Sequence, residues 1–313
     1  MKPRLLQHGR LPEATEARLA EHYDVHPFWT EADPAGFLAR HGSEFVALTT
    51  RAAIGADAAL LAALPSLRVI SSFGVGLDKL DLDTARQRGI AVGYTPDVLN
   101  DCVADTAFAL LLDVSRKVSA ADRFVRRGEW PKGQPFPLAT RVSGKRLGIL
   151  GMGRIGRVIA HRSVGFDMEV RYHSRNPAAD APYPYEASLE ALARWADYLV
   201  VATAGGPSTR HLVSAAVLDA LGPRGFLINI ARGTVVDEAA LVEALSRQRI
   251  AGAGLDVFED EPNVPEALFG LDNVVLLPHI ASATHETRQA MADLVFENLQ
   301  QFFATGAVKK SAI

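Results

Sequence analysis

Three segments in the second half of the chain carry side chains suited to acid–base chemistry on a small anion. They are Asn229–Gly233 with an arginine, Leu277–Ser282 with a histidine, and Gly254–Pro262 with several carboxylates. A histidine titrates near neutral pH and can donate a proton, and a paired carboxylate stabilises its charged form. An arginine binds a carboxylate through two parallel hydrogen bonds. Together these residue types suit reduction of a 2-oxo acid, with His279 as proton donor and Arg232 as anion clamp.

A glycine-rich turn lies upstream of these segments. Gly151-Met152-Gly153-Arg154-Ile155-Gly156 follows the apolar stretch 147–150 and precedes a helical pattern. In this context the glycines allow a tight turn, close approach of a pyrophosphate and close helix–strand packing. The helix N-terminus favours an anion through its free N–H groups. The motif therefore predicts these cofactor contacts: Gly151, Gly153, Arg154, Ile155 and Gly156. The alternative is a glycine-rich turn that binds no ligand.

The end of the next strand bears on which dinucleotide is bound. Enzymes that use NAD carry an acidic residue there for the ribose 2′-hydroxyl. This chain has Ser174-Arg175-Asn176 instead, with no carboxylate to repel a 2′-phosphate. We therefore predict NADP(H) as the preferred cofactor, bound by Ser174 and Arg175, with NAD(H) possible. A solvated arginine on an NAD enzyme is the alternative.

Composition excludes several other classes of protein. The chain has 313 residues and a net charge of −3, so it has no global basic field for nucleic acid or an anionic membrane. It has no apolar run of about 18 residues that could cross a membrane. The single cysteine, Cys102, excludes an intrachain disulfide and fits a reducing, cytoplasmic location. The histidines show no metal-ligand spacing, so we expect no metal.

The elements that must position these residues alternate between strands and helices, which predicts parallel sheets. The stretch 101–118 has helical periodicity, and it is either a bridge between two domains or an ordinary core helix. The expected strands are Arg4–Gln7, Tyr23–Phe28, Phe45–Thr49, Arg68–Phe73, Ile90–Gly93, Arg146–Leu150, Glu169–His173, Tyr198–Thr203, Gly225–Asn229, Ala251–Val257 and Val274–Leu277. The expected fold is α/β, with two doubly wound, Rossmann-like parallel-sheet domains and a cleft between them. The candidate residues then follow strand ends, where such sheets bind ligands.

The motifs together resemble the D-2-hydroxyacid dehydrogenase family over nearly the whole chain. Within it, the chain is most similar to the glyoxylate/hydroxypyruvate reductase branch, which includes hydroxyphenylpyruvate reductases. The matching stretches are Ser71–Lys79, Thr95–Leu99, the Gly151 turn, His173–Arg175, Ile230–Asp237, Gly254–Glu266 and Pro278–Thr284. The resemblance implies that Arg232 binds substrate, that His279 is the general acid/base and that Glu261, rather than Glu259 or Asp260, pairs with it.

The resemblance also implies further contacts. Backbone amides of Val75 and Gly76 would hold the substrate carboxylate, and Ser282 would shape the pocket beside the histidine. The remaining predicted cofactor contacts are Thr106, Ile230, Ala231 and Asp256. Two weaker ones, Thr203 and Thr209, lie in Ala202–Thr209, where an extra glycine departs from the family pattern.

The implied organisation is discontinuous. The substrate-binding domain would comprise 1–98 plus 288–313, and the dinucleotide-binding domain 99–287. The family also implies a homodimer, in which Trp130 lies near the subunit interface or else is a surface aromatic. Two other functions stay open: a dinucleotide-sensing, corepressor-like regulator, and an NAD-linked dehydrogenase of larger substrates such as hydroxyphenylpyruvate.

Overall fold

The computed structural model describes residues 2–313 and divides into two compact units. The first unit contains the chain up to Leu99 together with Ala283–Ile313, and the second is Asn100–Ser282. The first unit is therefore discontinuous in sequence. Its two junctions lie one and five residues from the positions that the sequence predicts, 98 and 288.

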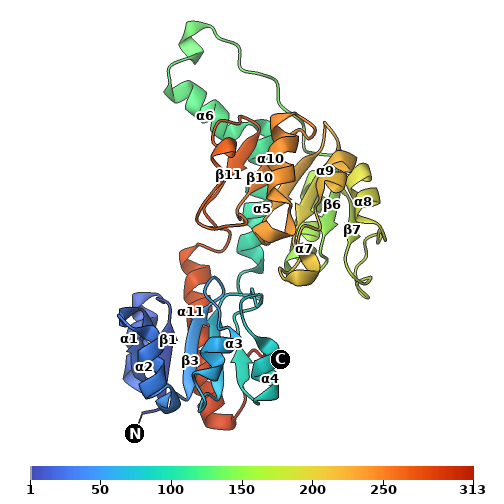
Figure 1. Cartoon of the computed structure of the whole chain (residues 1–313). Helices are drawn as coiled ribbons and strands as arrows, with labels where there is room; N and C mark the ends of the chain where they lie inside the picture. Colours follow the sequence, from blue (N-terminus) through green and yellow to red (C-terminus); the bar gives the residue numbers. More distant parts are fainter. Residues whose placement is uncertain (1) are drawn as a thin grey trace. The chain divides into compact units, whose positions relative to one another are not determined.

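The first unit is built on a five-stranded parallel sheet of order β2-β1-β3-β4-β5 (Figure 1). Strands β3 and β4 are almost wholly buried, as expected when helices cover both faces of a parallel sheet. The strands are β1 Arg4–His8, β2 Asp24–Pro27, β3 Ala47–Arg51, β4 Val69–Phe73 and β5 Ala91–Gly93. The helices are α1 Glu13–His22, α2 Pro34–His41, α3 Ala58–Ala62, α4 Leu82–Gln87 and α11 His285–Thr305.

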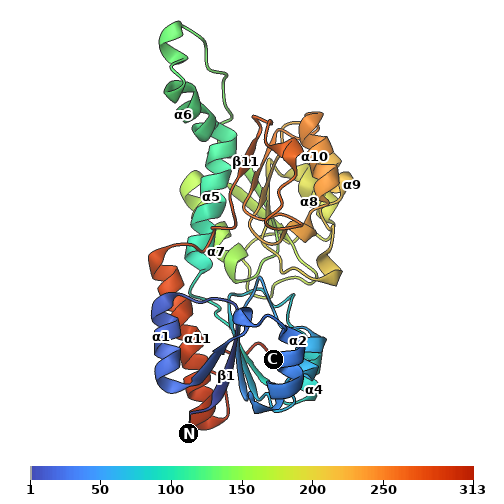
Figure 2. The same cartoon turned by 60° about the vertical axis from the view of Figure 1, so that its left-hand side comes forward.

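The C-terminal helix α11 returns to the N-terminal unit and packs on β4 and α1, as Figure 2 also shows. Its Asn298 is fully buried and donates to the backbone oxygen of Tyr94 at 3.1 Å. Ser71 in β4 donates to the backbone oxygen of Val295 at 3.0 Å. Buried side-chain hydrogen bonds of this kind fix the register of the helix on the sheet.

The second unit contains a six-stranded parallel sheet of order β11-β10-β9-β8-β6-β7. An isolated parallel bridge between Tyr172 and Tyr185 extends it beyond β7. The strands are β6 Arg146–Leu150, β7 Glu169–His173, β8 Tyr198–Val201, β9 Phe226–Asn229, β10 Gly252–Leu255 and β11 Val274–Leu276. The two parallel sheets confirm the predicted fold class, and the strands of residues 2–313 lie where the sequence predicts them.

Helix α5, Asn100–Arg116, lies wholly in the second unit and packs on β9, β10 and β11. Its Phe108 stacks on Phe166 with ring centroids 5.2 Å apart. It is therefore a core helix of this unit, which is the alternative that the sequence left open. The other helices are α6 Val118–Arg126, α7 Arg154–Ser163, α8 Leu189–Trp195, α9 Ala215–Leu221 and α10 Glu238–Ser246.

The sequence predicted one helix over 101–118, but the structure breaks it at Lys117. That residue has φ +57°, a left-handed conformation that ends α5, and a second helix, α6, follows. Helix α6 has no buried residue, and it extends with the segment after it away from the sheet (Figures 1 and 2).

Candidate active site

The carboxyl edge of the six-stranded sheet gathers most of the predicted site residues. Each of its strands is followed by one candidate segment: Gly151 follows β6, Ser174 follows β7, Thr203 follows β8, Arg232 follows β9, Glu261 follows β10 and His279 follows β11. In parallel α/β sheets this is the edge where ligands bind, because the strand ends open into loops there.

The glycine turn after β6 has the geometry of a phosphate-binding loop. Gly151 has φ +103°, and a Cβ placed on it would stand 2.8 Å from backbone atoms of Thr203. A Cβ on Gly156 would stand 2.0 Å from the carbonyl oxygen of Gly151, so this glycine sets the close helix–strand contact. Gly153 instead faces open space and caps α7 without a side-chain hydrogen bond. The first N–H groups of a helix have no intrahelical partner and favour an anion, and Gly153 leaves them without a side-chain cap. The cofactor contacts of this turn, including Arg154 and Ile155, stay predictions.

The structure brings His279 and Glu261 together, although 17 residues separate them in the chain. Nδ1 of His279 lies 2.7 Å from Oε2 of Glu261, and the two side chains are 40 % and 32 % exposed. His279 has φ +52°, and its backbone N–H donates to the carbonyl oxygen of Asp256 at 2.9 Å. Because Nδ1 faces the carboxylate, Nε2 is the ring nitrogen left for a substrate.

The environment keeps Glu261 ionised. Burial alone favours the neutral acid, but the hydrogen bond and charge of His279 outweigh it. The N–H of Phe258, 3.2 Å from Oε1, and the charge of Arg232 act in the same direction. The pKa of Glu261 is therefore lowered, and an anionic carboxylate faces the histidine at neutral pH.

Asp256 is fully buried and braces the turn that carries the histidine. Its two carboxylate oxygens accept the backbone N–H groups of Ile280 at 2.7 Å and Ala281 at 2.9 Å. Burial raises its pKa, although these two hydrogen bonds oppose the shift. Its predicted contact with the cofactor stays a prediction, whereas its positioning of the turn after His279 is a feature that the sequence did not show.

Arg232 lies in a turn that the buried Asn229 side chain stabilises through two hydrogen bonds. The Asn229 side chain is 1 % exposed, donates to the carbonyl oxygen of Arg232 at 3.0 Å and accepts from the N–H of Ala231 at 3.1 Å. A Cβ on Gly233 would stand 1.8 Å from the carbonyl carbon of Phe258. The arginine turn and the loop that carries Glu261 are therefore in backbone contact, a closeness that sequence spacing did not reveal.

The other predicted residues of the second unit take varied positions. Thr106 on α5 donates to the carbonyl oxygens of Cys102 at 3.2 Å and Ala281 at 3.4 Å, so it lies beside the histidine turn. Ser282 is partly buried at the end of the same turn. The hydroxyl of Thr209 closes its own loop by donating to the carbonyl oxygen of Ala204 at 2.9 Å.

The end of β7 is open to solvent. Arg175 is exposed, and Ser174 donates to the carbonyl oxygen of Asn176 at 2.8 Å. Tyr185 contacts this turn through a hydrogen bond to the carbonyl oxygen of Ser174, at 3.2 Å. An exposed guanidinium beside a hydroxyl can approach an added phosphate without burying charge.

Val75 and Gly76 belong to the first unit, where they follow the carboxyl end of β4. The preceding Gly74 has φ +136°, and its N–H donates to the hydroxyl of Thr95 at 3.0 Å. Val75 and Gly76 are partly exposed. This turn lies at the carboxyl edge of its own sheet, and substrate binding by the Val75 and Gly76 amides stays a prediction.

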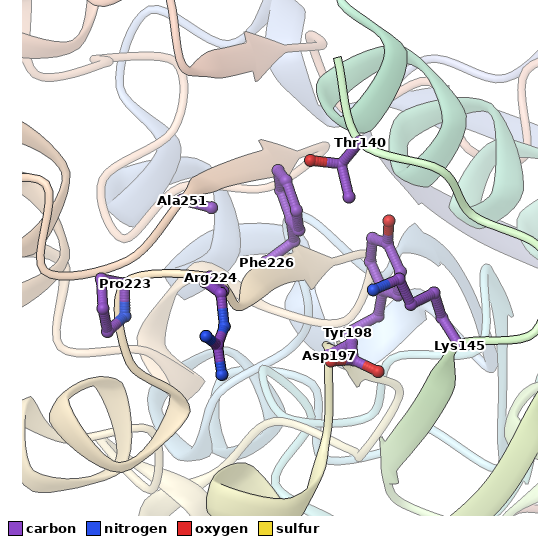
Figure 3. A pocket seen from close by; sticks show the side chains of 8 residues that line it. All are labelled: Thr140, Lys145, Asp197, Tyr198, Pro223, Arg224, Phe226 and Ala251. Atoms are coloured by element: carbon purple, nitrogen blue, oxygen red, sulfur yellow. The ribbon is translucent and has the colours of Figure 1, made fainter. Parts of the chain in front are cut away.

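A pocket of about 200 Å³ lies at the opposite, amino-terminal edge of the six-stranded sheet (Figure 3). It contains none of the predicted site residues. Its lining is Thr140, Lys145, Asp197, Tyr198, Pro223, Arg224, Phe226 and Ala251. Among residues 2–313 no cluster of three His, Cys, Asp or Glu side chains could hold a metal ion, and no helix is long and apolar enough to span a membrane.

A dinucleotide-type glycine turn and a histidine–carboxylate pair at one sheet edge define a dehydrogenase-like site. Residues 108–281, more than half of the chain, match the family model for the NAD-binding domain of D-isomer specific 2-hydroxyacid dehydrogenases. The chain belongs to this family and is a 2-hydroxyacid dehydrogenase or reductase with an NAD-binding domain.

Two plant relatives and one bacterial structure are similar over almost the whole chain. Hydroxyphenylpyruvate reductase of Plectranthus scutellarioides is 49% identical over 92% of this chain and 92% of its own. Glyoxylate/hydroxypyruvate reductase A HPR2 of Arabidopsis thaliana is 48% identical with the same coverage. The NADPH-dependent glyoxylate/hydroxypyruvate reductase of Sinorhizobium meliloti, solved with NADP and malonate, is 41% identical, with a TM-score of 0.91 over 100% of this chain and 97% of its own.

Proposed function

We propose that this enzyme reduces short 2-oxo acids with NADPH, converting glyoxylate to glycolate and hydroxypyruvate to D-glycerate. The observation that carries the proposal is the 2.7 Å contact between His279 and Glu261, on the sheet edge that also bears Arg232 and the glycine turn. Relatives named glyoxylate/hydroxypyruvate reductases support the choice of substrates.

The roles follow from the charges and contacts of the site. The cofactor, when bound, would supply the hydride that reduces the carbonyl carbon. His279, oriented by the anionic Glu261, donates a proton from Nε2 to the carbonyl oxygen. Arg232 binds the substrate carboxylate and polarises the carbonyl group. The substrate contact of Val75 and Gly76, which belong to the first unit, stays a prediction.

The preference for NADPH rests on Ser174 and Arg175. No carboxylate stands directly after β7, and the exposed guanidinium of Arg175 is available to neutralise a 2′-phosphate. The NADP held by the Sinorhizobium meliloti homologue supports this assignment. NAD(H) would bind more weakly, because it makes no use of this charge.

We also propose a homodimer. The segment from α6 to residue 140 presents apolar side chains to solvent: Val118 is 56 % exposed, Val125 52 %, Trp130 69 % and Leu138 98 %. Burial of such side chains is the usual driving force for association. A dimer mass in sedimentation, reduced to a monomer mass by Trp130→Asp with Leu138→Asp, would support this.

The proposed reducing, cytoplasmic location rests on the single cysteine.

One experiment tests the substrate and the cofactor together. Initial rates are measured with glyoxylate, hydroxypyruvate, pyruvate and hydroxyphenylpyruvate, each with NADPH and with NADH. We expect the highest kcat/KM for glyoxylate or hydroxypyruvate with NADPH. A higher value for pyruvate or with NADH would contradict the proposal.

A second candidate is reduction of hydroxyphenylpyruvate, since a relative of that name is 49% identical. It predicts that the aromatic substrate has the highest kcat/KM of the four, with NADH as the better donor. No turnover with any pair would favour the dinucleotide-sensing role instead.

A further inference from the structure

We propose that residues 204–211, the loop after β8, are a positioning element for both halves of the active site. Through Gly205 the loop sets the path of the Arg232 side chain, and through Arg210 and His211 it anchors the loop that carries Glu261. This inference rests on the roles proposed above for Arg232 and Glu261.

The first contact is a glycine against an arginine stem. A Cβ on Gly205 would stand 2.6 Å from Cγ of Arg232 and 3.3 Å from its Cβ. These are atoms near the root of the side chain, so the arginine cannot avoid a larger residue by moving its guanidinium alone. The extra glycine in this loop, unusual for the family pattern, therefore leaves the space that the Arg232 side chain occupies.

The second contact is an ion-pair cluster on Glu259. The guanidinium of Arg210 lies 2.5 Å from Oε1 of Glu259, and Nε2 of His211 lies 3.2 Å from the same oxygen. The backbone N–H of Glu259 donates to Oε2 of Glu238 at 3.1 Å. Side chain and backbone of Glu259 are thus both held, two residues before Glu261.

Backbone hydrogen bonds join the two contacts into one framework. The N–H of His211 donates to the carbonyl oxygen of Thr234 at 2.8 Å, and that of Val213 to the oxygen of Val235 at 3.0 Å. These bonds attach the end of the loop to the turn after Arg232. A displacement of the loop would therefore move the Arg232 side chain through one contact and the loop that carries Glu261 through another.

The two routes predict separable kinetic effects. Moving Arg232 weakens binding of the substrate carboxylate, so it raises KM. Loosening Glu259 disturbs the carboxylate that orients the imidazole, so it lowers kcat. The Glu259 ion pairs are partly exposed and contribute little to folding, so stability should barely change.

The first test is Gly205→Ala, with Gly165→Ala as the matched control. A Cβ on Gly165 meets no atom within 4 Å, and its φ lies outside the left-handed region. We expect Gly205→Ala to raise KM for glyoxylate about tenfold, with a smaller fall in kcat and with the Kd for NADPH and Tm near wild type. The control should match wild type in all four quantities.

The second test is Glu259→Gln, with Glu243→Gln as its control. Glu243 also has two basic partners, Arg247 and Arg249, and lies in the same unit, five residues along α10 from Glu238. We expect Glu259→Gln to lower kcat about tenfold while KM for glyoxylate stays within about twofold. Arg210→Lys, which keeps the charge, should retain more of kcat than Arg210→Ala.

Arg232→Ala separates this inference from the proposed function. If it leaves KM unchanged, the proposed role of Arg232 is wrong. If it raises KM but Gly205→Ala does not, only the positioning role of the loop is wrong. A kcat of Glu259→Gln equal to that of Glu243→Gln would likewise overturn the anchoring role. So would a fall in the kcat of Glu259→Gln that is accompanied by a clear fall in its Tm.

Discussion

The two edges of the six-stranded sheet each carry a carboxylate paired with a basic side chain, but the pairs are anchored differently. At the amino edge, Arg146 and Asp197 lie 3.2 Å apart, and Asp197 also accepts the backbone N–H of Arg146 at 2.9 Å. Arg146 opens β6, and Asp197 directly precedes β8. At the carboxyl edge, His279 and Glu261 lie in loops beyond the strands.

Under the proposed mechanism, the difference separates a structural pair from a catalytic one. The amino-edge pair joins the starts of two neighbouring strands, and its arginine does not change charge at physiological pH. The carboxyl-edge pair contains a histidine, the side-chain type most often used as a general acid or base, and it lies on loops that follow the strands of the sheet. The pocket of Figure 3 lies at the amino edge, so a hollow surface alone does not locate the chemistry.

The largest expected effect comes from removing the proton donor. His279→Asn should lower kcat about 10³-fold, since general acid catalysis contributes about 10² to 10⁴-fold. Asparagine tolerates the left-handed backbone at φ +52°, so the turn should keep its shape. Steady-state kinetics measure kcat, and NADPH titration measures the Kd for NADPH. Wild-type turnover in this variant would refute the general-acid role.

Glu261→Gln should lower kcat about 10²-fold, because the imidazolium loses its partner. The folded-state pKa of Glu261 is lowered, so its carboxylate stabilises the protein above its ordinary pKa of 4.5, and this contribution is lost as pH falls through the lowered value. The Tm difference between wild type and variant should therefore be present at pH 7 and shrink below pH 4.5. A difference that grows in acid would contradict the assignment.

Arg175→Ala tests the phosphate site at the same edge. It should raise KM for NADPH about tenfold and KM for NADH by less than about twofold, since NADH has no 2′-phosphate. Paired initial-rate measurements give both constants, with Arg247→Ala as a surface control. Equal changes for the two cofactors would remove Arg175 from the phosphate site.

The smallest kinetic effect is expected at the amino edge. Burial favours the neutral acid, but the hydrogen bonds and charge of Arg146 outweigh it and lower the pKa of Asp197. Asp197→Asn should cost about 1 kcal/mol at pH 7, or about 2–4 °C in Tm. The loss should vanish as pH falls below the ordinary value of 3.8. An unchanged kcat/KM would support a purely structural role for the amino-edge pair. A large fall in kcat/KM would contradict that role.

Much of this molecule could be predicted from local patterns. Apolar runs predicted the strands, because strands buried on both faces of a parallel sheet are rich in apolar residues. Two helices were missed. Helix α2 carries a recognisable signal, Asp33 as N-cap followed by proline at the first helical position, but buries little. Helix α6 has no fully buried residue and is separated from α5 by one left-handed residue, which periodicity does not reveal.

The sequence by itself determined the α/β class, the glycine turn and the residue types of the site, since these follow from period, strand–helix context and side-chain chemistry. Resemblance to a family pointed to Glu261 among the neighbouring carboxylates. Only the tertiary structure decided that Glu261 lies 2.7 Å from His279, that Asp256 braces the histidine turn and that Gly205 lies against Arg232. The physical reason is that these contacts join loops after different strands, whose proximity depends on strand order and packing.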